Sequence, residues 1–292
     1  MNLRPAVVVE LDYLAIGHAT RDLRGDSYRT GGTVAYAART ASELGCRVGV
    51  ITSTDGGLDL DRVLPHVLVT NALAQATTTF ENITVAGGRR QAIHHIAKPL
   101  FPAMVPEGWR PAIVHIGPVA QECDPAFASA FGTAFVGVTP QGWMRQWDEQ
   151  GQVSHCRWSG MEDVLARADA VVLSLEDVAG NWDLVAEYAE QARLLAVTLG
   201  AQGCTVFCEG QSRHFPVPVV DEEDSTGAGD IFAASFFFAL QRGGARSGVG
   251  DPWAAARFAN CIAVQSVTRS GLSSTPTSAE VARCRRTTRR AH

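Results

Sequence analysis

Segments with the pattern of buried strands alternate with segments of helical periodicity along this chain of 292 residues. Residues 6–17 are largely apolar and β-branched, Gly31-Gly32 opens a helical pattern that Gly45 closes, and residues 47–52 form the next apolar run. A strand, a helix and a strand in this order are the building block of a parallel sheet. Further strands are predicted at 112–116, 134–138, 170–173, 195–198 and 205–208, and helices at 227–242 and 252–267. The pattern predicts one doubly wound α/β domain over residues 1–292, with helices on both faces of its sheet.

One pair of strand patterns departs from this alternation. Residues 77–85 and 90–96 flank the turn sequence Ala86-Gly87-Gly88-Arg89, which is typical of a β-hairpin. Two consecutive strands within an α/β pattern indicate a local antiparallel excursion. We therefore expect a small β flap on the main domain.

Charge and hydropathy exclude several classes of function. The chain has 25 basic and 30 acidic residues, a net charge of −5, which argues against nucleic acid as the main partner. Its most apolar run, 231–240, is half the length of the about 20 residues that a membrane span needs. Glu10 and Asp12 interrupt the stretch where a signal peptide would be apolar. We expect a cytoplasmic protein with no membrane partner, and a disordered basic tail at 283–292.

Cysteine and lysine usage narrows the chemistry. The seven cysteines are scattered and no CxxC occurs, so neither a zinc ribbon nor a thioredoxin-type pair is encoded, and reduced structural thiols are expected. The only lysine is Lys98, followed directly by a proline. A Walker P-loop needs its lysine next to Ser or Thr after a glycine loop, so that way of holding phosphates is excluded.

The string Asp224-Ser225-Thr226-Gly227-Ala228-Gly229-Asp230 runs directly into the apolar segment IFAASFFFAL. Small residues let the backbone approach a ligand, and the first turn of a helix has unpaired amides that bind anions. Asp230 follows at once, so a base for a hydroxyl and donors for a migrating phosphoryl group lie within four residues. The alternative is a glycine-rich turn in which Asp224 or Ser225 caps the helix. The complete string with its buried helix favours the anion site.

These residues resemble a known family. DSTGAGD followed by a helix of small and aromatic residues is similar to the second signature of the ribokinase-like, or PfkB, sugar kinases. The segment 31–38, GGTVAYAA, resembles their first signature, and 17–22, GHATRD, their opening strand. The similarity runs over most of the chain in the expected order and ends with the Asn260 helix and the Gly271 loop.

The resemblance implies a site for an acceptor hydroxyl. Asp230 would be the catalytic base, and the amides of Gly227–Gly229 would form the anion hole. Asp22 and the backbone of Gly31 and Gly32 would bind substrate hydroxyls. Strands from about 18–30 and 77–97 would form a lid over the substrate, and through this lid a homodimer is expected.

The resemblance also implies a site for the phosphate donor, ATP with Mg²⁺. The residues expected along the nucleotide are Ser174, Thr198, Gly200, Thr226 and Asn260. Asp177 is expected to hold the metal.

Three departures from the family pattern bear on the substrate. Tyr36 stands where the family usually has a sugar-binding asparagine; a tyrosine can stack on a ring or shrink the pocket, and an aromatic there resembles the inositol-kinase-like branch. The metal motif Asn-x-x-Glu is replaced by Ser174 to Asp177, and strand alternation would turn Glu176 to the other side. The segment 139–143, TPQGW, replaces the usual Asp-x-Asn-x-Arg.

Three interpretations remain open at the level of sequence. The first is an ATP-dependent kinase for a hydroxyl of a small sugar or polyol, with a cyclitol such as myo-inositol as the expected acceptor. The second is a nucleoside kinase of the same family. The third is a catalytically inactive kinase fold that binds a ligand or a protein; the Ser174 and Asp177 replacements favour it, and the complete DSTGAGD argues against it.

Overall fold

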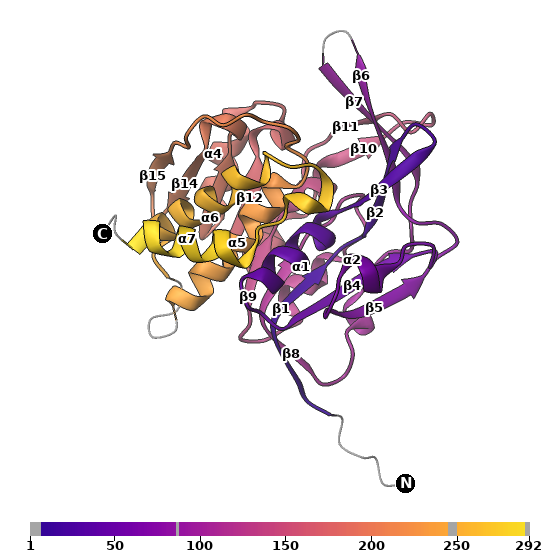
Figure 1. Ribbon diagram of the computed structural model, residues 1–292, viewed down its shortest axis with the longest axis horizontal. Helices are drawn as coiled ribbons and strands as arrows, with labels where there is room; N and C mark the ends of the chain where they lie inside the picture. The colour runs from indigo at the N-terminus through magenta and orange to yellow at the C-terminus, as the bar shows by residue number, and fades with distance from the viewer. Residues whose placement is uncertain (1–6, 86–87, 245–249, 290–292) are drawn as a thin grey trace.

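The computed structural model describes residues 7–85, 88–244 and 250–289, and its centre is a nine-stranded sheet (Figure 1). The strand order is β15-β14-β13-β12-β9-β8-β1-β4-β5, and all neighbours are parallel except those of β14. The strands are β1 (Val9–Ile16), β4 (Val48–Thr54), β5 (Leu68–Leu73), β8 (Trp109–Ile116), β9 (Phe135–Val138), β12 (Ala170–Ser174), β13 (Leu194–Thr198), β14 (Cys204–Cys208) and β15 (Gln211–Phe215). The predicted strands are thus present, and β5 and β15 extend the two edges beyond them.

Helices cover both faces of this sheet, as predicted. One face carries α1 (Thr33–Glu43), α5 (Ala228–Gly243) and α6 (Pro252–Ser266), with α7 (Ser278–Arg289) against α6; the other carries α3 (Met161–Leu165) and α4 (Trp182–Gln191). Strand β12 shows why: Ala170 and Val172 belong to the core of the first face, and Val171 and Leu173 to that of the second. Alternation over a doubly covered strand makes its whole sequence apolar. The short elements are α2 (Leu60–Val63), η1 (Pro102–Met104), η2 (Pro125–Ser129), η3 (Pro140–Met144), η4 (Leu175–Val178), η5 (Gly200–Gln202) and η6 (Gly271–Ser274).

Helix α5 packs unusually close to the sheet. A Cβ on Gly137 of β9 would lie 2.4 Å from the Phe237 ring of α5, so only glycine permits this approach. Phe232, Phe236 and Phe237 are at most 2% exposed, and each such burial contributes about 1.5–3 kcal/mol. This packing fixes the start of α5 at the carboxyl edge of the sheet.

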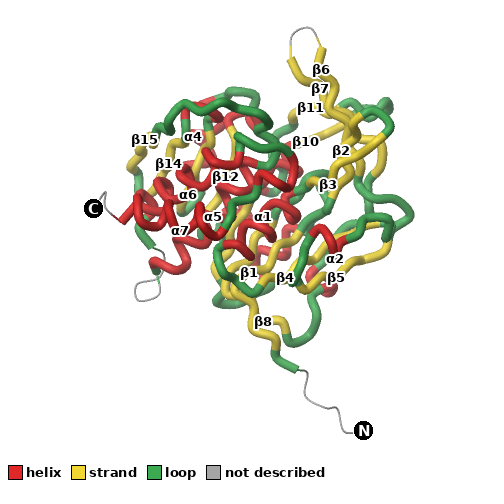
Figure 2. Tube along the Cα trace, viewed as in Figure 1, coloured by secondary structure: helices red, strands yellow, loops and turns green. Residues whose placement is uncertain are grey.

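A second, smaller sheet projects from the main domain (Figures 1 and 2). Its order is β3-β2-β6-β7, formed by β2 (Thr20–Arg24), β3 (Ser27–Gly31), β6 (Thr79–Val85) and β7 (Gly88–His95). The two segments that we expected to supply lid strands therefore join in one sheet. The predicted hairpin is formed by β6 and β7, and its turn residues 86–87 lie outside the described residues. A two-stranded ribbon, β10 (Arg145–Trp147) and β11 (Val153–His155), meets β7 through a bridge between Ala92 and Gln152.

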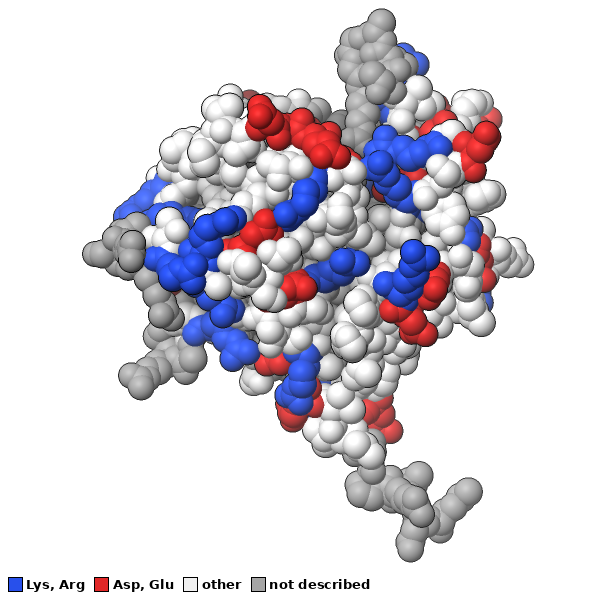
Figure 3. Space-filling view, viewed as in Figure 1, with Lys and Arg blue, Asp and Glu red and all other residues white. Residues whose placement is uncertain are grey.

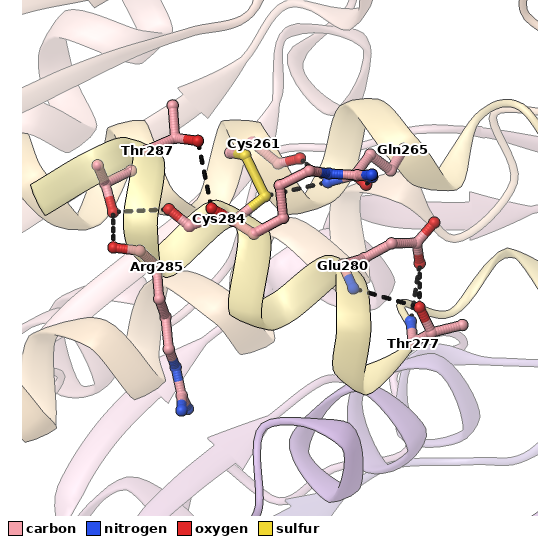
Figure 4. Close-up of a disulfide and its surroundings, with 9 residues drawn as sticks. Cys261, Gln265, Thr277, Glu280, Cys284, Arg285 and Thr287 are labelled. Atoms are coloured by element: carbon pink, nitrogen blue, oxygen red, sulfur yellow. Dashed lines mark hydrogen bonds between the residues drawn. A yellow bond between two sulfur atoms is a disulfide. The ribbon is translucent and has the colours of Figure 1, made fainter. Parts of the chain in front are cut away.

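The C-terminal segment corrects two expectations. The basic tail is not disordered over residues 283–289, because these belong to α7; residues 290–292 lie outside the described part. The expectation that all cysteines are reduced thiols is wrong for two of them, since Cys261 of α6 and Cys284 of α7 form a disulfide (Figure 4). Helix α7 packs along α6 and places the two Cα atoms 5.7 Å apart, a proximity that sequence spacing does not reveal.

Acidic and basic side chains are interspersed on the face shown in Figure 3, without one continuous positive area. Within the described ranges, no helix has both the length and the apolar character needed to cross a membrane.

Candidate active site

A cleft of about 890 Å³ opens between the carboxyl edge of the main sheet and the small sheet. It collects the predicted site residues from widely separated parts of the chain. Those that line it are Asp22, Gly32, Tyr36, Ser174, Asp177, Thr198, Gly200, Thr226, Gly227, Ala228, Gly229, Asp230 and Asn260. Gly31 does not line the cleft, but it touches Asp22, which does.

The DSTGAGD string forms the turn into α5. Gly227 has a left-handed backbone, φ 83°, and a Cβ there would lie 2.4 Å from Cδ1 of Tyr36. Glycine is therefore required both by the dihedral angle and by the close approach. The amide of Ala228 already donates to the carbonyl of Ser225 at 3.1 Å, whereas the described hydrogen bonds include none from the amides of Gly227 and Gly229. The amides of this turn that could donate to an anion are accordingly those on either side of Ala228.

Asp230 lies in the first turn of α5, surrounded by protein yet open to the cleft. Burial raises the pKa of its carboxyl to about 6. The Asp177 and Asp22 carboxylates raise that pKa further, while a hydrogen bond from Thr33 and the Arg145 guanidinium lower it. The group is thus ionised at neutral pH but basic enough to accept a proton from a hydroxyl, which suits a general base.

Arg145 also lines the cleft, and the sequence motifs did not indicate it as a site residue. It begins β10, donates from Nη1 to the carbonyl of Val119 at 3.0 Å, and holds its guanidinium 5.5 Å from the Phe80 ring centroid. Burial lowers its pKa, and the carboxylates of Asp177, Asp230, Glu122 and Asp22 act in the opposite direction. Because arginine stays protonated in proteins, Arg145 places a fixed positive charge in the cleft. The feature of the sequence that could have indicated Arg145 is its place just after the TPQGW segment, a few residues beyond the end of a strand.

Glu122 fixes the loop that contains Val119, whose carbonyl accepts the hydrogen bond from Arg145. Its buried carboxylate accepts hydrogen bonds from the amides of His18, Val119 and Ala120 at 2.7–3.0 Å. Amide donors satisfy a buried carboxylate and draw the loops after β1 and β8 together. The Val119 carbonyl, and with it Arg145, is positioned by this contact.

Asp22 and the Gly31-Gly32 segment lie together at the start of α1. A Cβ on Gly31 would be 2.3 Å from Oδ2 of Asp22, and one on Gly32, φ 88°, would be 2.2 Å from the carbonyl oxygen of His18. Asp22 also accepts a hydrogen bond from Thr20 at 3.0 Å. The two glycines thus let the Asp22 carboxylate lie directly over the backbone that opens α1.

Tyr36 packs behind the turn that leads into α5. It is 2% exposed, its ring packs against Gly227, and its edge lines the cleft. Burial raises its pKa, and the carboxylates of Asp22, Asp230 and Asp224 raise it further, so the phenol is neutral. The Tyr36 side chain fills the space behind the Gly227 turn. The sequence did not predict this contact between Tyr36 and Gly227.

The far end of the cleft is lined by Thr198, Gly200 and Asn260 together with the 217–220 segment. Asn260 is 8% exposed and its Nδ2 donates to the carbonyl of Phe215 at 2.9 Å, so it ties α6 to β15. Val219 is 95% exposed and forms an apolar rim. This end combines apolar surface with polar backbone, the composition of a small-molecule site.

Ser174 and Asp177 form a capping box at the start of η4. Asp177 accepts from the Ser174 amide at 2.8 Å and from Nε2 of Gln141 at 2.9 Å, and Ser174 Oγ accepts from the Glu176 amide. Glu176 also lines the cleft, so the expectation that it would turn to the other side was wrong. The strand ends at Ser174, and strand alternation therefore does not apply to Glu176.

The described residues contain no group of three or more His, Cys, Asp or Glu side chains arranged for a metal ion. Mg²⁺ does not require one, since it keeps several waters and is bound through one or two carboxylates together with substrate phosphates. Each oxygen of Asp177 has one lone pair beyond its present hydrogen bond. The carboxylate also lies near enough to Asp230 to raise its pKa, so a hydrated cation here would offset that repulsion. The donor set therefore fits such an ion.

The fold is that of the ribokinase-like kinases. A structure of a pyrophosphate-dependent kinase in the ribokinase family, complexed with a pyrophosphate analog and myo-inositol, superimposes with a TM-score of 0.73 at 22% identity and covers 89% of this chain and 96% of that chain. Arabidopsis thaliana ribokinase complexed with ribose and ATP gives a TM-score of 0.72 at 16% identity and covers 94% of this chain and 99% of that chain.

At the level of sequence, the pfkB family carbohydrate kinase model matches residues 162–279, so the resemblance to this family is confirmed over that segment. A fructokinase from Klebsiella pneumoniae is 30% identical over 143 residues, 44% of this chain and 45% of the fructokinase. The chain thus spans about half the length of the curated relatives it matches.

Proposed function

We propose that this protein is a kinase that transfers a phosphoryl group to a hydroxyl of a small sugar or polyol. The observation that carries the proposal is the position of Asp230, a carboxylate with pKa raised to about 6, directly beyond the amide-lined turn and near the guanidinium of Arg145. A base, an anion site and a fixed cation within one cleft are the parts that phosphoryl transfer requires.

The reaction would proceed by one displacement at phosphorus. Asp230 accepts the proton of the acceptor hydroxyl as its oxygen forms a bond to the transferred phosphorus. The bond from phosphorus to the leaving oxygen of the donor breaks, and the donor retains that electron pair. The amides of Gly227 and Gly229 and the charge of Arg145 stabilise the oxygens of the migrating group.

ATP is the donor that we propose, lying along Thr198, Gly200, Thr226 and Asn260. Asp177 would hold Mg²⁺ through its water shell, with Ser174 supporting it. The ion, when bound, neutralises phosphate charge. A pyrophosphate-dependent kinase shares the fold, so pyrophosphate is the donor to test beside ATP.

The acceptor side combines the carboxylate of Asp22, the backbone of Gly32 and the hydroxyl of Thr139 with the Phe80 ring. Several polar groups together with an aromatic ring suit an acceptor ring with many hydroxyls. A cyclitol such as myo-inositol is the acceptor we propose, since a ribokinase-family kinase of the same fold binds it. Fructose is included in the test because of the fructokinase relatives. Nucleosides are included because the sequence motifs are also compatible with a nucleoside kinase of the same family.

The test is release of ADP, or of orthophosphate from pyrophosphate, by the purified chain with Mg²⁺ across a panel of cyclitols, sugars and nucleosides. We expect one acceptor to stand clear of the background, and Asp230→Asn to abolish that signal. Donor binding by calorimetry without turnover for any acceptor would favour an inactive, ligand-binding kinase fold. Absence of both binding and turnover would contradict the proposal.

We also propose that two copies associate through the small sheet, because the edge of β3 has no strand beside it in the described sheet. Light scattering should give twice the mass of 31.1 kDa. A mass of one chain in concentrated solution would contradict this.

A further inference from the structure

A buried chain of hydrogen bonds crosses three neighbouring strands beneath the cleft. The hydroxyl of Tyr13 on β1 lies 2.8 Å from Nδ1 of His115 on β8, and Nε2 of His115 lies 2.9 Å from Oγ1 of Thr139, which follows β9. Tyr13 and His115 are both fully buried. Such a polar chain inside an apolar core is costly unless every member is paired, so its hydrogens can be assigned by counting.

The count determines which ring nitrogen of His115 carries the proton. In the described part of the chain the Tyr13 hydroxyl has one hydrogen-bond partner, Nδ1, and a buried phenol must donate its hydrogen. Nδ1 is therefore the acceptor. A neutral imidazole then carries its hydrogen on Nε2 and donates it to Thr139.

The ring does not change charge under ordinary conditions. Burial lowers the pKa of His115 to about 3. Its surroundings are apolar as well as buried: the Phe237 ring of α5 contacts it edge-on, with centroids 5.0 Å apart. The direction of the chain, from Tyr13 to His115 to Thr139, is thus fixed.

Thr139 ends this chain at the cleft. Its oxygen accepts from His115, so its own hydrogen is left to point elsewhere; it is 7% exposed and lines the cleft. A Cβ on Gly117 would lie 3.0 Å from Oγ1 of Thr139 and 2.3 Å from the methyl carbon of Thr33, so both threonine side chains lie beside this glycine. Thr33, which borders Gly117 together with Thr139, is also hydrogen-bonded to Asp230, the proposed base.

We propose that Thr139 is a specificity residue of the acceptor site, a hydroxyl held as a hydrogen-bond donor by the buried Tyr13–His115 pair. It would donate to an oxygen of the acceptor beside the one that reacts. A donor with fixed direction favours a ring oxygen or hydroxyl that can accept at that place and disfavours an acceptor without one. Tyr13 and His115 act through Thr139 and are positioning residues. The inference rests on the proposed kinase function.

The direction of the chain is tested without activity. Nitrogen NMR of histidine-labelled protein, with the His115 signal identified by its loss in His115→Gln, should show a neutral ring protonated on Nε2 from pH 5 to pH 8. Tyr13→Phe removes the donor to Nδ1, and the second tautomer should then appear. A ring protonated on Nδ1, or charged in this range, would overturn the proposal.

The role in specificity is tested by kinetics with the best acceptor of the panel, taking myo-inositol and fructose as first probes. Thr139→Val should raise the acceptor KM about tenfold, the effect of one lost hydrogen bond, and leave the donor KM unchanged. Thr139→Ser restores the hydroxyl and should remain within about threefold of the wild type. Tyr13→Phe, with Thr139 intact, should lie between the two. Equal changes in both KM values, or no change for Thr139→Val, would overturn the proposal.

An acceptor series makes the test directional. In the wild type, replacing the hydroxyl that Thr139 contacts by fluorine, which accepts but does not donate, should cost less than replacing it by hydrogen. The difference should vanish in Thr139→Val; its persistence there would contradict the assignment. Absence of transfer by the wild type to any acceptor contradicts the underlying function instead, and the inference with it, while the NMR result still reports the tautomer.

Discussion

The two sides of the cleft are built in different ways. The transfer side, Gly227–Asp230, is a single run of sequence at the start of one buried helix. The proposed acceptor side draws Asp22 from β2, Tyr36 from α1, and Thr139 and Arg145 from the two ends of η3. The first is set by local backbone geometry and the second by packing between elements that are far apart in the chain. If the two sides have the proposed roles, the chemical step is constrained by local sequence, and the choice of acceptor by the packing of separate elements.

The largest expected effect falls on the transfer side. Asp230→Asn should lower kcat by about a thousandfold or more, because a general base contributes about 10²–10⁴. Asp163→Asn, an exposed carboxylate on α3, is the matched control and should keep full activity. Equal turnover in both variants would remove the proposed mechanism.

The same variant makes a second, opposite prediction for stability. Because the folded-state pKa of Asp230 is raised above its ordinary value of 3.8, its contribution to stability is lost as pH rises through about 6. Asp230→Asn should therefore unfold at or above the wild-type temperature at pH 8. A large loss of stability instead would indicate that its inactivity reflects misfolding.

Two glycine substitutions in this turn distinguish an effect on stability from an effect on turnover. Gly227→Ala should destabilise the fold by about 1–3 kcal/mol, because the left-handed dihedral and the Tyr36 ring both oppose a Cβ. A Cβ on Gly229 meets nothing within 4 Å, so Gly229→Ala should keep or slightly raise stability while lowering kcat about tenfold to a hundredfold by crowding the anion site. Thermal unfolding and turnover are measured on both variants. Equal changes in the two would contradict the different roles given to Gly227 and Gly229.

Arg145 tests whether the acceptor side also takes part in the transfer. Arg145→Gln should reduce kcat about tenfold to a hundredfold, by loss of a cation near the migrating charge. Arg167→Gln, at an exposed position just after α3 that does not line the cleft, serves as the control. Arg145 also lowers the pKa of Asp230, so its removal should move the acidic limb of the kcat/KM profile to higher pH. A loss of activity without that movement would place Arg145 away from the base.

A shift of the acidic limb in the opposite direction is expected at Asp177. Its carboxylate raises the pKa of Asp230, so Asp177→Asn should move the acidic limb to lower pH. The variant should also need more Mg²⁺ for half-maximal activity if Asp177 holds the ion. An unchanged Mg²⁺ requirement would assign Asp177 to the η4 cap alone.

The smallest effect on activity is expected far from the catalytic turn. Cys284→Ser removes the link between α6 and α7, and loss of a disulfide costs about 2–4 kcal/mol. Turnover should stay within about twofold, because Asp230 and Thr139 are held by α5 and the sheet rather than by α7. Loss of turnover in the folded variant would show that the C-terminal helix shapes the site.

The sequence predicted the fold and the turn into α5 because both follow from local patterns. Alternating apolar runs place the strands, and the glycines of DSTGAGD have their own conformational reason. Arg145, Thr139 and the support of Gly227 by Tyr36 could not be predicted, since each depends on a contact between segments far apart in the chain. The Cys261–Cys284 pair and the order of the tail have the same cause, because both follow from the packing of α7 on α6.

Phosphorus NMR of the full chain with Mg²⁺, the acceptor found by the panel and either ATP or pyrophosphate tests the central claim most directly. The account predicts a new phosphate monoester resonance that grows with the loss of one donor, appears only with the acceptor and is absent for Asp230→Asn. Release of orthophosphate alone from ATP, at the same rate with and without every acceptor, would contradict it.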